Sequence, residues 1–304
     1  TIFALEELTQ KFSAATLFSV LVATVSAVSI SRHFLGENPS FLIPSSGTVT
    51  YVSPESFIIF ISLGIIAGVL GVLFAKTIFF NLKLYDKMHK IPNWFKPAVA
   101  GFAVGITGLF LPYILGGGNT AIDQLLLNKF SIWMIILIFA GKFFITPFCF
   151  SSGAAGGIFL PMLMLGSFLG YGLGIISNYS GLHIDMVTIS IVGMGAFLAA
   201  VARTPITAVV MVFEMTGDYH NILPVMFSVA IADLVAEKLH HAPIYSSLIL
   251  KQDTPSKEKN ILTKIQAVDA MDKNIKKIHL KNTINEALEM FNNSAYDILP
   301  IADN

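Results

Sequence analysis

A glycine-rich break between two apolar stretches is the part of this sequence whose residue types can do chemistry. Residues 141–170 read GKFFITPFCFSSGAAGGIFLPMLMLGSFLG, with Lys142 as their one charged residue. A helix that begins at Gly157 points the unbonded N–H groups of Gly157, Ile158 and Phe159 toward the break. Because helix N-termini attract negative charge, the break predicts an anion site.

Two interpretations of the break stay open. Small residues can simply fill a helix kink by close packing, as is common in membrane bundles. Alternatively, non-helical backbone at membrane depth carries unpaired N–H and C=O groups, which are tolerated where protein or a water-filled cavity receives them. An anion held by N–H groups, without a full Lys or Arg charge, is released quickly. The second interpretation therefore favours transport over storage.

Composition indicates a membrane protein with a soluble tail. Charged residues make up 12% of the 304 residues and apolar residues 54%, whereas soluble domains carry about 25% charged residues. Of the 38 charged side chains, 16 follow residue 250. We expect a transmembrane domain over residues 1–250, a linker over 251–264 and a soluble domain over 265–304.

The membrane part is predicted to be all-α and polytopic, with broken helices. Gly and Pro interrupt many of its apolar stretches, which suits a transporter. The connection 83–96 contains four lysines, whereas the connection 33–56 contains no Lys or Arg. Because positive residues are enriched in cytoplasmic loops, we expect the connection 83–96 and the tail to lie on the cytoplasmic side. The apolar stretches are Ala14–Ile30, Phe57–Phe80, Phe95–Leu111, Ile132–Phe150, Gly157–Gly174, Val187–Val201, Ile222–Val235 and the shorter Thr204–Met215.

A weak internal repeat links the two ends of the membrane part. FALEELTQKFSAATLFSVLVA and VVMVFEMTGDYHNILPVMFSVAI share an apolar run, a Glu, a nearby Thr and then FSV. Either this is coincidence among apolar sequences, or it marks two homologous halves, as in many transporters. The chain opens within an apparent helix and stops abruptly after Ile298–Ile301, so we expect a fragment cut at both ends.

Three segments of the membrane part resemble the CLC family of chloride channels and transporters. The resemblance rests on GKFFITPFCFSSGAAGGIFLP, on IVGMGAFLAAVARTPITAVVMVFEMTGDY and on HAPIYSSLIL. It implies an inverted-repeat fold and a homodimer with one anion pathway in each subunit. Residues 1–34 correspond to the end of the first half and residues 57–235 to the second. The family's central serine and external gating glutamate lie in signatures that this sequence lacks, so selectivity among chloride, nitrate and fluoride stays open.

The resemblance also assigns roles to residues of the anion pathway. It implies that the backbone N–H groups of Ile158 and Phe159 and the hydroxyl of Tyr245 coordinate the central anion. From its type alone, Tyr245 fits an interfacial aromatic anchor better, and its place in the anion site rests on the resemblance. The loop that forms this anion site contains Gly156, Gly157 and Pro161.

An acidic pair near the start of the chain bears on the mechanism. By resemblance, Glu7 matches the internal glutamate that passes protons in the family's exchangers, and Glu6 a neighbour that helps to hydrate the route. A carboxylate at a helix end can also be simply solvated, but an acidic pair in an apolar segment is costly and indicates an ion or proton route. We therefore expect a chloride/proton antiporter, with a passive chloride channel as the alternative.

The tail resembles the first part of a CBS domain, a small α/β fold. Thr283 and Glu286 have capping-box spacing, and we expect short strands at Ile275–Leu280 and Ile298–Ile301 on either side of the helix. Paired CBS domains often bind adenine nucleotides, so a complete pair predicts a nucleotide site. A nucleotide-regulated membrane scaffold without transport is the alternative of another class.

Several functions are not expected. The seven His show no metal-ligand spacing, so we predict no metal site, and the single cysteine, Cys149, excludes an intrachain disulfide. No nucleophile–base pair, phosphate loop or basic patch is present, and the net charge is zero. We expect neither an enzyme, nor a resident cofactor, nor a nucleic-acid partner. The expected partners are chloride, protons, a lipid bilayer and a second copy, in a multi-pass protein of the cell membrane with a cytoplasmic CBS region.

Overall fold

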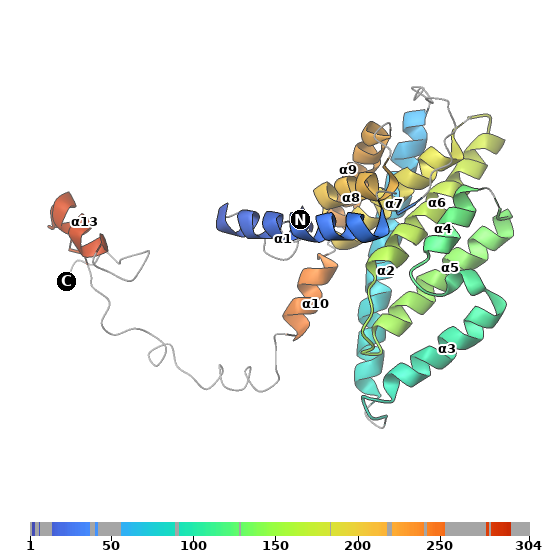
Figure 1. Cartoon of the computed structure of the whole chain (residues 1–304), viewed down its shortest axis with the longest axis horizontal. Coiled ribbons are helices and arrows are strands. Elements are labelled where there is room, and N and C mark those ends of the chain that lie inside the picture. The colour runs from blue at the N-terminus through green and yellow to red at the C-terminus, as the bar shows by residue number, and fades with distance from the viewer. Residues whose placement is uncertain are drawn as a thin grey trace. The chain divides into compact units, whose positions relative to one another are not determined.

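The computed structural model describes residues 2–3, 6, 14–36, 40–41, 56–88, 91–127, 129–182, 184–217, 221–239, 242–252, 278–279 and 281–292. The chain divides into two compact units, Thr1–Ile249 and Leu250–Asn304. Figure 1 labels its α-helices, and a short 3₁₀ helix, η2 (Pro112–Ile114), joins α3 to α4. The described α-helices are α1 (Ala14–Leu35), α2 (Ser56–Lys87), α3 (Lys96–Phe110), α4 (Asn119–Leu126), α5 (Ile132–Phe150), α6 (Phe159–Tyr179), α7 (Met186–Ala202), α8 (Pro205–Thr216), α9 (Ile222–Lys238), α10 (Ile244–Gln252) and α13 (Ile284–Asn292).

Every apolar stretch singled out in the sequence overlaps a helix, and α5 has the predicted bounds. Four of these helices, α1, α2, α5 and α6, are long and apolar enough to cross a membrane. Helices α3, α7 and α8 are apolar but shorter, as expected for a fold with broken helices. The helical membrane part of the prediction is therefore confirmed.

Helix α7 is the centre of the first unit. Every residue from Thr188 to Ala202 is buried, and α7 packs against α2, α6, α8 and α9. A helix that is apolar all round must be surrounded by other elements, and MVTISIVGMGAFLAAVA has that composition. The most extensive packing in the unit is between α6 and α7, so α7 fixes the position of the helix that follows the glycine-rich break.

Glycines allow α6 and α7 to approach at backbone distance. A Cβ atom added at Gly166 meets the carbonyl group of Gly193, and one added at Gly170 meets that of Ile189. Small residues one turn apart are the usual means of close helix contact in membranes. A Cβ atom added at Gly172, on the same helix, has nothing within 4 Å, so this constraint belongs to one face of α6.

This difference gives a matched pair of substitutions on one helix. Gly170→Ala forces a methyl group into the α7 backbone and is expected to lower the free energy of unfolding by about 1–3 kcal/mol. Gly172→Ala is expected to be neutral or to raise it by up to about 1 kcal/mol, because alanine favours helix and meets open space. Thermal or denaturant unfolding in detergent measures both. Equal stabilities of the two variants contradict the close contact.

The second unit contains the predicted capping box. The Thr283 N–H donates to Glu286 Oε2 at 2.9 Å, and the Glu286 N–H donates to Thr283 Oγ1 at 3.4 Å, at the start of α13. The backbone bond from Thr283 lowers the pKa of Glu286, with help from the Asn282 amide. The strand expected at 298–301 lies outside the described residues, as does most of the one expected at 275–280.

Candidate functional site

The glycine-rich break lies between two long helices. Helix α5 ends at Phe150, and α6 begins at Phe159 with Ile158 as its N-cap. The chain turns at Gly153, whose φ of 86° belongs to the left-handed region that glycine adopts readily. The predicted helix start at Gly157 is wrong by two residues, because glycine is a poor helix former and the apolar run that packs α6 begins only at Ile158.

The first turn of α6 carries unbonded donors. The Met162 N–H donates to the Ile158 carbonyl at 3.0 Å, and Pro161 has no N–H. No side chain caps this helix. In the described part of the chain, the N–H groups of Ile158, Phe159 and Leu160 have no acceptor. The break therefore presents three backbone donors and the positive end of a 21-residue helix, which is the arrangement that binds an anion.

Tyr245 lies on α10 and packs against the same apolar cluster as the start of α6. That cluster includes buried Ile158 and Ile244 and has Phe159 and Tyr245 at its edge. The Tyr245 ring meets Phe3 edge-to-face, with the ring centroids 5.2 Å apart. This cluster is the large apolar core of the first unit, so the joint role of the three residues in one anion site stays a prediction.

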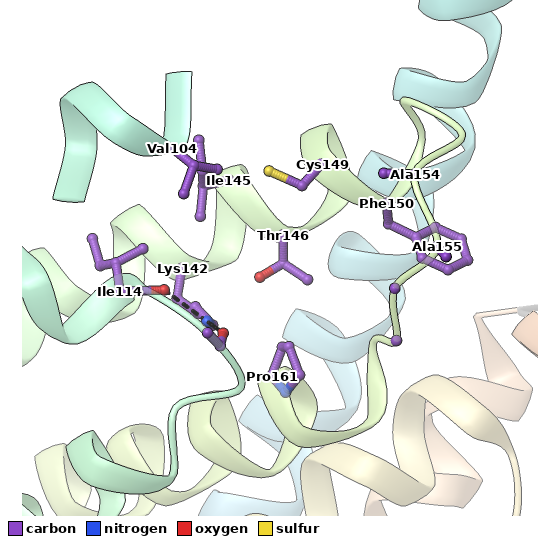
Figure 2. A pocket seen from close by; sticks show the side chains of 13 residues that line it. Val104, Ile114, Lys142, Ile145, Thr146, Cys149, Phe150, Ala154, Ala155 and Pro161 are labelled. Atoms are coloured by element: carbon purple, nitrogen blue, oxygen red, sulfur yellow. Dashed lines mark hydrogen bonds between the residues drawn. The ribbon is translucent and has the colours of Figure 1, made fainter. Parts of the chain in front are cut away.

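The other predicted loop residues line a cavity of about 220 Å³, shown in Figure 2. Gly156, Gly157 and Pro161 belong to one wall, and α5 supplies five of the other lining residues. Sequence reasoning missed Lys142, which lines this cavity from α5. The signal was present: the polar residues Lys142, Thr146 and Cys149 recur at helical spacing in an otherwise apolar segment.

Glu6 sits at the N-terminus of another helix, α8. Its carboxylate accepts hydrogen bonds from the Ile206 N–H at 3.2 Å, the Thr207 N–H at 2.7 Å and the Thr207 hydroxyl at 2.6 Å. The local N-cap residue, Thr204, makes no side-chain cap, so Glu6 caps α8 from 200 residues away. Glu7, the predicted proton-transfer residue, lies outside the described residues.

Arg203 is engaged by α9. It ends α7 with a φ of 61°, and its Nη1 atom donates to both the carbonyl and, at 2.6 Å, the Oδ1 atom of Asp233. A second contact, 3.8 Å long, joins Nη2 to Glu237 Oε2. The guanidinium is thus held by one carbonyl and two carboxylates of α9.

These features define a polytopic helical membrane protein. They are the long apolar helices, the close glycine contacts between helix backbones and the uncapped helix N-terminus at the glycine-rich break. The family described as voltage gated chloride channel matches residues 1–237. The chain belongs to this family, whose members are integral membrane proteins.

Curated relatives include transporters of known name. The chain is 35% identical over 257 residues to the H(+)/Cl(-) exchange transporter ClcA of Vibrio cholerae, covering 81% of this chain and 54% of the relative. It is 33% identical over 270 residues to the protein of the same name from Salmonella typhimurium, covering 85% and 56%. The chain thus spans about half the length of the curated relatives that it matches.

Solved structures agree with this assignment. A slow cyanobacterial Cl⁻/H⁺ antiporter superposes with a TM-score of 0.74 at 30% identity, covering 83% of this chain and 60% of that one. A CLC-type fluoride/proton antiporter superposes with a TM-score of 0.64 at 22% identity, covering 78% and 58%. The second likeness supports the fold alone.

Proposed function

We propose that the protein to which this chain belongs exchanges chloride for protons across the cell membrane. The observation that carries the proposal is the start of α6, where the N–H groups of Ile158, Phe159 and Leu160 have no acceptor among the described residues. Backbone donors bind an anion without a full positive charge, so it leaves as readily as it enters. Antiporters among the relatives and solved structures add support.

The proposal assigns Ile158, Phe159 and Tyr245 to the chloride site, Gly156, Gly157 and Pro161 to its loop, and Glu7 to proton transfer. Glu6, which helps to hydrate the proton route, also holds the start of α8. The protein acts as a homodimer in a lipid bilayer, and its tail after residue 264 is a cytoplasmic CBS region that binds adenine nucleotide when a complete pair is present. Support for these assignments comes from the sequence resemblance.

The test is simultaneous recording of both ions. Full-length protein is reconstituted into liposomes loaded with chloride, and an external chloride electrode and pH electrode are read together. We expect chloride efflux to drive proton uptake at a fixed ratio. Chloride efflux without proton movement identifies a passive channel, and the absence of both fluxes favours a scaffold.

Tyr245→Phe tests the hydroxyl assigned to the anion site. Loss of one hydrogen bond to a charged group costs about 1.5–3 kcal/mol, so we expect chloride affinity to fall by about tenfold or more in calorimetric titration. The phenyl ring of the variant retains the edge-to-face contact with Phe3, so the fold is preserved. An unchanged affinity assigns Tyr245 to aromatic anchoring instead.

A further inference from the structure

Helix α5 has one polar face. Among residues 132–150 the sequence is almost wholly apolar, and Lys142, Thr146 and Cys149 follow one another at intervals of four and three residues. That spacing places all three on the same side of a helix. All three line the cavity of about 220 Å³ beside the glycine-rich loop (Figure 2). The polar face is therefore turned toward this cavity, which is open on the side of the exposed loop.

Lys142 brings a positive charge to this cavity. The residue is 2% exposed, and its Nζ atom donates to the carbonyls of Ile114 at 2.8 Å and Gly116 at 2.5 Å. An ammonium group has three donors, so one remains. Within the described residues both ion pairs involve Arg203, and no carboxylate pairs with Lys142. A buried charge without a counter-ion is costly, so the site calls for an anion.

Thr146 supplies a second unused donor. It is 8% exposed, and its hydroxyl makes no hydrogen bond to any residue that the structure describes. Other helical threonines donate to the carbonyl one turn back: Thr24 to Val20 at 2.7 Å and Thr107 to Ala103 at 3.0 Å. Figure 2 shows the Thr146 side chain projecting from α5 into the space between Lys142 and Pro161.

The loop from Ala154 to Gly157 forms the opposite wall. The Ala154 N–H donates to Ser152 Oγ at 3.3 Å, but the N–H groups of Ala155, Gly156 and Gly157 have no acceptor among the described residues. At both glycines the Cβ position is open, with nothing within 4 Å. Backbone donors can therefore approach a small ligand closely from this side.

We propose that this cavity binds a small inorganic anion, paired with the Lys142 ammonium and the Thr146 hydroxyl. The site adjoins the one at the start of α6 and shares the loop residues Gly156, Gly157 and Pro161 with it, but Ile158 and Phe159 do not line it. Its volume of about 220 Å³ is large enough for a halide with part of its hydration shell. The apolar walls provided by Val104, Ile145 and Phe150 strengthen the attraction between ammonium and anion.

Anomalous diffraction from crystals of the full-length protein grown in bromide tests this site. We expect a bromide peak within hydrogen-bond distance of both Lys142 Nζ and Thr146 Oγ1, in addition to the peak at the start of α6. Lys142→Met keeps the length of the side chain and is expected to remove the cavity peak alone. A bromide peak at the start of α6 with none in the cavity overturns this inference and leaves the proposed function standing. A bromide peak in the cavity with none at the start of α6 supports this inference and contradicts the anion site of the proposed function.

A second pair of variants covers the case in which Lys142→Met does not fold, since Lys142 also holds the η2 turn. Thr146→Val removes one hydroxyl at nearly constant shape and leaves the lysine contacts intact. We expect the bromide concentration that half-fills the cavity to rise about tenfold, as for one lost hydrogen bond to a charged group. Gly172→Ala, which does not line the cavity and whose added methyl group meets open space, is the control and is expected to leave occupancy unchanged. Equal occupancy in Thr146→Val and the control overturns the assignment.

Discussion

Proline at position 159 is expected to abolish chloride binding at the start of α6. Phe159 is the first residue of that helix, and proline is tolerated at the first helical position because its fixed φ suits the helix. The substitution therefore removes one N–H donor while α6 itself persists. Isothermal titration of chloride into the purified full-length protein is expected to show no binding for Phe159→Pro.

Two controls separate the lost donor from other effects. Ile158→Val changes a side chain and keeps its backbone N–H, so it is expected to bind like the wild type. Proline disfavours the helical conformation at the preceding residue, and Ile158 has φ −103° and ψ −9°. Replacing the amide of residue 159 by an ester removes the donor without that constraint, and we expect a loss of affinity of about tenfold or more. Wild-type affinity in the ester variant contradicts the assignment.

The long helices were predictable because their signal is local. Helix α5 is a 19-residue apolar run that begins after Ser131 and ends where serine and glycine follow, and its predicted bounds are confirmed. The break after it was also predictable, since Gly and Ser are unfavourable in helices. The start of α6 was predicted two residues too early, because glycine weakens the helix signal at Gly156 and Gly157 without fixing where the first turn begins.

The short helices were missed because packing decides them. Helix α4 has eight residues, too few to be stable by propensity alone. It buries Ala121, Ile122, Leu125 and Leu126 against the rest of the first unit. Its start depends on Gly118, whose φ of 103° indicates a turn only once the fold is known. Helix α10, with nine residues, falls in the same range.

Contacts between distant residues could not be read from the sequence at all. The carbonyls that receive Lys142 lie 28 and 26 residues before it, and Glu6 caps a helix 200 residues further on. Hydropathy and spacing contain no information on such pairs. The sequence resemblance supplied roles for Glu6 and Glu7 as neighbours on a proton route, but the attachment of Glu6 to α8 is visible only in the folded chain.

That attachment makes Glu6 and Glu7 a matched pair for testing the proton route. The Glu6 carboxylate accepts bonds from two backbone N–H groups and one hydroxyl. These bonds fix the carboxylate at the start of α8, so we expect Glu6 to serve as a helix cap. We expect Glu6→Gln, whose side-chain oxygen still accepts hydrogen bonds from α8, to retain coupled transport.

Glu7→Gln is expected to have the opposite outcome. A proton that crosses apolar protein needs titratable groups or water, and glutamine removes the titrating group at nearly constant volume. The anion site consists of backbone N–H groups and a hydroxyl, which do not titrate near neutral pH. In liposomes with both electrodes, we therefore expect chloride efflux to continue in Glu7→Gln while chloride-driven proton uptake disappears. The two substitutions differ only in which of two adjacent carboxylates they remove. If proton uptake survives in Glu7→Gln, Glu7 is not the transfer group. If proton uptake is lost equally in Glu6→Gln, the transfer role is not specific to Glu7.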